Sequence, residues 1–297
     1  MRNVVSMVCI FAVALCFVAA APADQPELKA SQGVNLGVEK EAGQPTAATG
    51  RSSVRLGATD FGDTSFSMNA LARPEVYPVD GARGGCGNAL ITQSTDPSTI
   101  LGGNSVACSP DGGITTTENN FARCYDLSQG ITAGQAFDLK CIEFGVEAVN
   151  DGGSGADLTL ELRVSSYGNC LSPAFTPGVS GTQLYRATVV LPVAGTYPNL
   201  ETHVLPSTVS IPADSIVVVE VIVPDTSGVT GFFMGSNASG ESQPSYLASA
   251  SCGLTTYQTF ASIGFPNVQI LLNLVGDLPN PVNGACCTDA TAGCVED

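Results

Sequence analysis

Residues 214–224, Asp-Ser-Ile-Val-Val-Val-Glu-Val-Ile-Val-Pro, constrain the fold of this chain more than any other stretch. Most of them are β-branched, and β-branched side chains favour strands over helices. Because side chains alternate along a strand, we expect two apolar faces. One face is formed by Val217, Val219, Val221 and Val223, and the other by Ile216, Val218, Glu220 and Ile222. Such a strand is typical of the middle of a sandwich.

Further strands are predicted between turn-forming residues along the chain. Gly-rich turns interrupt short apolar runs at the spacing typical of sandwiches and barrels. Residues 157–165 alternate cleanly, which indicates an antiparallel strand with one exposed face. The expected strands are 88–93, 119–127, 139–148, 157–166, 183–192, 202–211, 215–223, 229–236, 245–250, 258–264 and 267–276. We therefore expect an all-β, jelly-roll-like antiparallel β-sandwich.

Composition divides the chain into four parts. Residues 1–21 have a basic start, an apolar core and small residues at the end, which indicates a secretory signal peptide. A transmembrane anchor is the alternative. Residues 22–83 are expected to be a disordered, low-complexity leader or linker, and residues 84–277 to form the sandwich. Residues 278–297 are expected to form a linker and a Cys-rich tail.

Export determines how the cysteines are interpreted. Of eleven cysteines, those in the predicted sandwich are Cys86, Cys108, Cys124, Cys141, Cys170 and Cys252. An even set in an oxidising compartment predicts disulfides, although many pairings are possible. The pairs that we expect are Cys86–Cys108, Cys124–Cys141 and Cys170–Cys252. A zinc site is the alternative, but the spacings lack a paired Cys-x-x-Cys arrangement.

The charge of the chain limits its partners. The formal net charge is −16 at pH 7, and an acidic chain repels phosphate groups. We therefore expect no nucleic-acid partner, and no membrane contact after removal of the signal. Acidic loops favour cations, calcium above all. The low charged fraction of 13% and the abundant glycine are typical of an extracellular all-β domain.

Arg123 and Glu220 each interrupt an otherwise apolar strand face. A lone buried charge is unfavourable, so each side chain needs a partner of opposite charge. We predict a buried ion pair between Arg123 and Glu220, with Glu143 as the second choice for the carboxylate. A catalytic acid or base at this position is the alternative interpretation.

Two loops are candidates for binding. Oxygen atoms of Asn150, Asp151, Ser154 and Asp157 lie within one Gly-rich loop, where they can hold calcium, although the spacing differs from that of an EF-hand. The polar loop 235–244 suits a sugar-binding edge. The ligand-binding residues predicted there are Asn237, Glu241, Gln243 and Tyr246.

Catalysis is not predicted. Glycoside hydrolysis needs two nearby carboxylates, and the outward side chains of Glu143, Glu147, Glu161, Arg163 and Arg186 are candidates for one shared sheet face. His203 is the sole histidine, and it lies in an ordinary strand without a Gly-x-Ser-x-Gly motif nearby. We expect these residues to be structural, and no catalytic residue is assigned.

The tail and the body resemble parts of other secreted proteins. The tail Gly284-Ala-Cys-Cys, ending in Gly293-Cys-Val, resembles Cys-rich tails of large secreted proteins from planctomycete-like bacteria, but it is shorter. The body is similar to uncharacterised bacterial secreted sandwich domains. The segments that carry this resemblance are 120–127, 142–147, 244–247 and 252–253. The resemblance implies a fold and a compartment, and no activity.

These observations favour a secreted or cell-surface module that is not an enzyme. We expect it to bind extracellular polysaccharide or cell-surface components with help from calcium, or to serve a structural role at the surface. The alternative is an extracellular hydrolase with a glycosidase-like carboxylate pair, or a degenerate copy of one.

Overall fold

The structure is a computed structural model, and it describes residues 27–30, 75–78, 85–129, 133–170 and 181–278. Nearly every regular element in these ranges is an antiparallel strand, and the exception is a single 3-10 turn, η2 (Ala250–Cys252). The all-β prediction is confirmed. Among the described residues, no helix has the length and hydrophobicity needed to span a bilayer. The predicted signal peptide and most of the tail lie outside these ranges.

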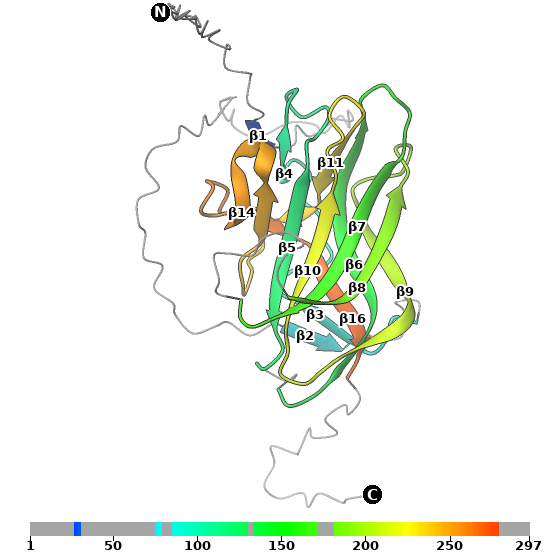
Figure 1. Cartoon of the computed structure of the whole chain (residues 1–297), viewed down its shortest axis with the longest axis vertical. Helices are drawn as coiled ribbons and strands as arrows, with labels where there is room; N and C mark the ends of the chain where they lie inside the picture. Colours follow the sequence, from blue (N-terminus) through cyan, green and yellow to red (C-terminus); the bar gives the residue numbers. More distant parts are fainter. Residues whose placement is uncertain (1–26, 31–74, 79–84, 130–132, 171–180, 279–297) are drawn as a thin grey trace, which may run out of the picture.

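Two large sheets form the body of the molecule. We name the first the front sheet because it faces the viewer in Figure 1. Its strand order is β14-β13-β5-β10-β7-β8, with β10 paired on both edges. The bounds of these strands are β5 Asn119–Asp126, β7 Leu158–Tyr167, β8 Thr182–Leu191, β10 Ile216–Val223, β13 Tyr246–Ser249 and β14 Leu254–Thr259.

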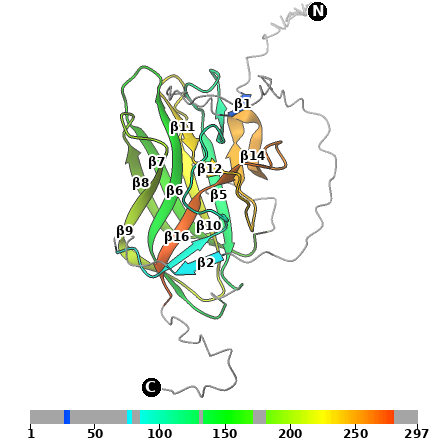
Figure 2. The same cartoon turned by 180° about the vertical axis from the view of Figure 1, so that it is seen from behind.

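The second, or back, sheet faces the viewer in Figure 2. It is built on the long strand β6 (Phe137–Asp151). β9 pairs with β6 over residues 137–146, whereas β16 and β11 pair with successive parts of β6. The other bounds are β2 Glu75–Pro78, β3 Ala89–Thr92, β9 Asn199–Ile211, β11 Thr230–Met234 and β16 Leu272–Asp277. Two small two-stranded sheets pair β1 (Glu27–Ala30) with β4 (Val106–Ser109), and β12 (Ser236–Asn237) with β15 (Gln269–Ile270).

The inner faces of the two sheets bury one apolar core. The predicted inner faces of β10 and β7 are confirmed, since Val217, Val219, Val221 and Val223, and Leu158, Leu160, Leu162 and Val164, all belong to this core. Phe121 and Phe232 meet edge to face within it, with ring centroids 5.9 Å apart. The opposite face of β10 is buried at Val218 and Glu220 and half-buried at its ends, and Val218 joins a smaller cluster there with Ala122, Cys124 and Tyr257. β10 is thus the central, doubly buried strand that the sequence predicts.

Two details of the expected architecture differ. Residues 75–78 pair with β3 in the back sheet, and residues 27–30 pair with β4 in a small separate sheet, so strands already occur within the predicted leader, before residue 84. These added strands have four residues each, too few for a recognisable alternating pattern. The strand expected over 258–264 instead spans Leu254–Thr259 and ends in a turn. The jelly-roll connectivity stays a prediction.

All six cysteines of the body form disulfides, as expected, but every predicted pairing is wrong. The observed pairs are Cys86–Cys141, Cys108–Cys252 and Cys124–Cys170. Sheet order explains the difference. Cys86 precedes β3 and Cys141 lies on β6, and both strands flank β16 in the back sheet. Cys124 on β5 and Cys170 after β7 similarly flank β10 in the front sheet.

Candidate functional site

Arg123 is buried between the two sheets and links the front sheet to the loop 241–245 and to β15. It lies on the inner face of β5, and its Nη1 is 2.9 Å from Oε2 of Glu241. The same guanidinium donates to the carbonyl of Gln243 at 2.8 Å and to that of Ile270 at 2.7 Å. Charged donors in such a fixed fork make strong hydrogen bonds. Arg123 therefore anchors the loop 241–245 and the start of the β15–β16 segment to the front sheet.

The predicted ion pair between Arg123 and Glu220 is wrong. In the register of β5 and β10, Arg123 lies opposite Val219, and Glu220 lies opposite Ala122. Residues one position apart point to opposite faces of a sheet. Arg123 therefore points into the core, while Glu220 lies on the outer face of the front sheet. Both side chains are buried, as predicted, but their partners differ.

Glu220 begins a row of charged side chains on that outer face. Its Oε1 accepts a hydrogen bond from the hydroxyl of Tyr257 at 2.8 Å, and its Oε2 is 3.9 Å from Nη1 of Arg163. Arg163 binds Glu161 at 2.5 Å, and Glu161 also binds Arg186 at 2.5 Å. We name Glu220, Arg163, Glu161 and Arg186 the charged row. The exposed fraction of the side chain rises along it from 0% at Glu220 to 58% at Arg186.

Tyr257 reaches Glu220 across two intervening strands. β13 and β5 separate β14 from β10, and they carry the small residues Ala248 and Ala122 in the same buried cluster as Tyr257. Burial raises the pKa of the Tyr257 hydroxyl well above its usual value, and the neighbouring Glu220 carboxylate raises it further. The tyrosine therefore remains a hydrogen-bond donor.

Glu143 and Glu147 do not join the charged row, so the face expected to carry all five charged residues is divided. Both glutamates lie on β6 in the back sheet, and both are buried. Glu147 accepts hydrogen bonds from the amide of Gly103, at 2.8 Å, and from the hydroxyl of Ser105. The amide group of Asn273 lies 3.4 Å from Glu143. Glu147 thus holds loop 93–105 against the back sheet, whereas the contact described for Glu143 lies within that sheet.

A groove lies beside this loop. It has a volume of about 220 Å³ and is lined by residues 103–106 and 264–268. Its polar side chains come from Asn104, Ser105 and Asn267, and its apolar surface includes Phe265 and Pro266. Phe265 is half-buried, while Pro266 and Asn267 are exposed. The groove thus combines a ring, amide groups and backbone groups at the surface, and no charged side chain lines it.

Asn104 connects the groove to the predicted ligand-binding loop 235–244. Its amide nitrogen donates to the hydroxyl of Ser236 at 2.9 Å, to the carbonyl of Asn237 at 2.9 Å and to that of Asn267 at 3.1 Å. These bonds hold the two walls of the groove together. Sequence reasoning missed this groove because residues 103–106 and 264–268 are far apart in the chain. The only local signal was an aromatic residue and an amide residue, Phe265 and Asn267, just before a strand.

Of the four predicted ligand-binding residues, Asn237 lies beside the groove, where its carbonyl accepts from Asn104, and the described contacts of Asn237, Glu241 and Gln243 stabilise the protein itself. The side chain of Asn237 is buried and donates to the carbonyls of Asp96, at 2.8 Å, and Thr99, at 3.1 Å. Glu241 binds Arg123, and Gln243 contributes its carbonyl to the same side chain. Tyr246 lies on the outer face of the front sheet, where burial raises the pKa of its hydroxyl. Their role in binding stays a prediction.

The predicted calcium loop forms a tight turn between β6 and β7. One carboxylate oxygen of Asp151 accepts the amides of Gly155, at 2.9 Å, and Gly153, at 2.8 Å, and these bonds lower the pKa of Asp151. Asp157 accepts the amide of Val193, and Ser154 donates to the carbonyl of Val229. The side-chain amide of Asn150 donates to the carbonyl of Gly113. Within the described ranges, no group of three or more His, Cys, Asp or Glu side chains is placed to hold a metal ion. Calcium binding stays a prediction.

His203 joins the two sheets at their edges. Its Nε2 lies 2.7 Å from the hydroxyl of Tyr185, and the residues come from β9 and β8. Burial lowers the pKa of His203. The imidazole thus has a tyrosine partner, which agrees with the structural role expected for it.

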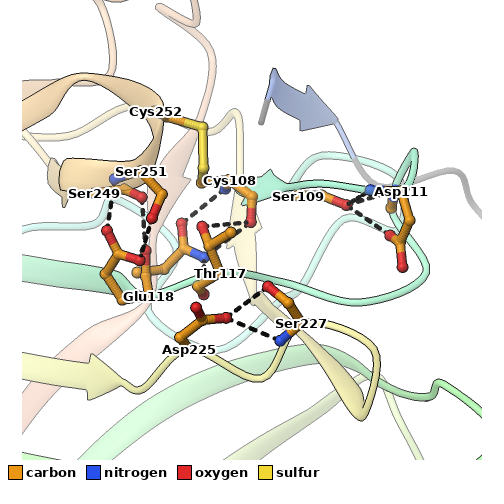
Figure 3. The surroundings of a disulfide bond; sticks show 12 residues. Cys108, Ser109, Asp111, Thr117, Glu118, Asp225, Ser227, Ser249, Ser251 and Cys252 are labelled. Atoms are coloured by element: carbon orange, nitrogen blue, oxygen red, sulfur yellow. Dashed lines mark hydrogen bonds between the residues drawn. A yellow bond between two sulfur atoms is a disulfide. The ribbon is translucent and has the colours of Figure 1, made fainter. Parts of the chain in front are cut away.

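Figure 3 shows a third polar cluster, around the Cys108–Cys252 disulfide. The carboxylate of Glu118 accepts the amide and the hydroxyl of Ser251, both at 2.6 Å. Ser249 donates to the carbonyl of Glu118. These hydrogen bonds fix the turn η2 to Glu118, just before β5, and the disulfide fixes η2 to β4.

No protein-family model matches the chain, and no curated protein matches it either.

Proposed function

We propose that this protein is a secreted, disulfide-stabilised binding module that recognises carbohydrate at the groove formed by residues 103–106 and 264–268. One observation carries the proposal: the groove places exposed amide and backbone groups beside a half-buried aromatic ring. Its partners would be extracellular polysaccharides or other cell-surface components.

The chemistry of the groove suits a neutral, hydroxyl-rich ligand. Asn267 offers both a donor and an acceptor, and sugar hydroxyls need both. Phe265 and Pro266 offer apolar surface for the C–H face of a sugar ring. Pockets for drug-sized ligands measure roughly 300–1,000 Å³. The smaller groove, of about 220 Å³, therefore suits a single sugar residue or the end of a chain.

The proposed calcium site is the loop that contains Asn150, Asp151, Ser154 and Asp157. The hydrogen bonds described for Asp151 and Asp157 are made by Oδ1 in each case. Calcium prefers oxygen ligands from carboxylates and carbonyls, and a Gly-rich turn can supply both. The ion would fix this turn, and it would assist binding by stabilising the sandwich.

The test is a glycan array on residues 24–297, run with calcium and with a chelator. We expect binding to a defined class of neutral glycans, lost in Asn267→Ala and in Phe265→Ala. Gln183→Ala is the matched control, because it removes an exposed amide from the opposite edge strand, β8. If the wild-type protein bound no glycan in either condition, carbohydrate recognition would be refuted. If it bound equally well with calcium and with chelator, the calcium role would be refuted. A structural role at the cell surface would then be the better proposal.

The second candidate function is glycoside hydrolysis at the charged row. Arg163 contacts both Glu161 and Glu220, so two carboxylates lie on either side of one guanidinium. Retaining glycosidases use carboxyl groups about 5–5.5 Å apart, a spacing that such a bridge allows. Release of reducing ends from the glycans that bind would support hydrolysis if Glu220→Gln abolished it. Glycan binding without release of reducing ends would favour the binding module over the hydrolase.

A further inference from the structure

The first strand of the chain is an added edge strand. β1 pairs antiparallel with β4, from Glu27 opposite Ser109 to Ala30 opposite Val106. The two strands form a small sheet of their own, apart from the front and back sheets. Figures 1 and 3 both show β1 beside β4. Its pairing therefore depends on main-chain hydrogen bonds to a single neighbour.

β4 has one edge already occupied and one edge that accepts β1. The side chain of Asn119 accepts from the amide of Cys108 at 2.7 Å and donates to the carbonyl of Cys108 at 3.2 Å. Successive residues of a strand direct their backbone groups to opposite edges. Those of Ala107 and Ser109 therefore point away from Asn119, toward β1.

The accepting edge is held in place and is covered by β1. With β1 paired, all four residues of β4 are buried, and the disulfide to Cys252 ties Cys108 to η2. Buried backbone groups without hydrogen-bond partners are strongly unfavourable. An edge strand of this kind is also a template for a strand from another chain.

We propose that the edge of β4 is a strand-acceptor site that takes β1 from a second copy of this chain. Residues 31–74 separate β1 from β2. Fully extended, that segment reaches on the order of 140 Å, so its length does not restrict β1 to its own sandwich. Every copy carries the same β1 sequence and the same acceptor edge, so the register is identical in both arrangements.

Concentration decides between the two arrangements. A connecting segment of this length gives β1 a local concentration on the order of 1 mM at its own acceptor. Strand exchange is therefore favoured where copies are crowded, as at a cell surface. Reciprocal exchange closes a symmetric dimer, and one-way donation extends a row of copies. This inference does not depend on the carbohydrate groove, and either proposal can fail without the other.

Cysteine trapping tests the exchange. Lys29 and Ala107 are partners in the β1–β4 register, and partners in an antiparallel pair have Cα atoms about 4.5–5.5 Å apart, which suits a disulfide. Residues 24–297 carrying Lys29→Cys are mixed with the same chain carrying Ala107→Cys, warmed and cooled over a range of concentrations, and then oxidised. We expect a covalent dimer that becomes abundant near 1 mM and is suppressed by excess peptide of residues 24–33.

Two controls make each outcome decisive. The double variant Lys29→Cys/Ala107→Cys reports pairing within one chain, and a mixture of Lys29→Cys with Ala187→Cys, on β8, reports random collision. A double variant that closes on itself while the mixture stays monomeric at 1 mM would overturn the proposal. If neither the double variant nor the mixture cross-linked, the acceptor site itself would be overturned. The same would follow if Lys29→Cys cross-linked to Ala187→Cys as often as to Ala107→Cys.

Discussion

At the scale of single residues, the buried side chain of Arg123 joins parts of the molecule that are far apart in sequence. It binds Glu241 and the carbonyls of Gln243 and Ile270, and it has little contact with solvent. Removing one partner of a buried ion pair leaves the other charge and its acceptors unsatisfied. The Arg123–Glu241 pair therefore matters for stability mainly because removing either side chain is strongly unfavourable.

We expect Arg123→Met to lower the free energy of unfolding by about 3–5 kcal/mol. Urea denaturation measures the change. Arg186→Met is the matched control, because that side chain is 58% exposed and its ion pair with Glu161 is expected to contribute less than about 1 kcal/mol. In a double-mutant cycle, Arg123 should couple to Glu241 and not to Glu220. Equal losses for the two arginine variants would contradict this account.

Tyr257 makes the protein sensitive to alkali. Its folded pKa lies well above the ordinary value of 10.0, because of burial and the nearby Glu220 carboxylate. The unfolded chain therefore releases this proton at lower pH than the native state does. The resulting contribution to stability is complete below pH 10 and is lost as the pH rises through the folded pKa. Tyr125, also buried, has a raised pKa and acts in the same direction.

Replacing Tyr257 by Phe tests both effects of the hydroxyl. At pH 7 the variant should lose about 1.5–3 kcal/mol, because Glu220 loses a charge-assisted hydrogen bond. Above pH 10 its stability should fall less steeply than that of the wild type, with the remaining slope due to Tyr125 and the other tyrosines. Unfolding free energies at several pH values between 7 and 11.5 measure this. Parallel curves for the two proteins would show that Tyr257 does not couple to pH.

At the scale of elements, strand faces were predictable and strand neighbours were not. The two faces of β10 follow from alternation alone, and the structure confirms them. Disulfide pairing depends on sheet order, which no local pattern in the chain specifies. The prediction of the partner of Arg123 was wrong for a similar reason. A shift of one residue in the β5–β10 register exchanges the two faces of a strand. The groove was missed because it joins two loops from distant parts of the sequence.

The three disulfides differ in their access to solvent. Cys252 is half-buried in η2, whereas the cysteines of the other two bonds are at most 8% exposed. Thiol–disulfide exchange needs access to a sulfur atom. A low concentration of reductant, followed by alkylation and mass mapping, should therefore label Cys108 and Cys252 before the others. Earlier labelling of Cys86 or Cys124 would show that local opening, rather than native burial, controls reduction.

At the scale of the whole molecule, the disulfides and the acidic charge both suit an exported protein. The bonds join residues 46, 55 and 144 positions apart, so each closes a long loop of chain. Removing one such bond from a secreted domain typically costs about 2–5 kcal/mol. Total stabilities of domains are only about 5–15 kcal/mol, so loss of all three bonds is comparable with the whole stability.

Folding should therefore require an oxidising compartment. We expect residues 24–297 to be soluble when exported and oxidised, and unfolded or aggregated when produced under reducing conditions. Peptide mapping without reductant should recover Cys86–Cys141, Cys108–Cys252 and Cys124–Cys170. The melting temperatures of the oxidised protein and of the completely reduced protein give the quantitative comparison. If the reduced chain melted at the same temperature as the oxidised one, the core between the two sheets would be sufficient by itself. The disulfides would then protect against extracellular proteolysis or partial opening, and they would no longer indicate the compartment in which the chain must fold.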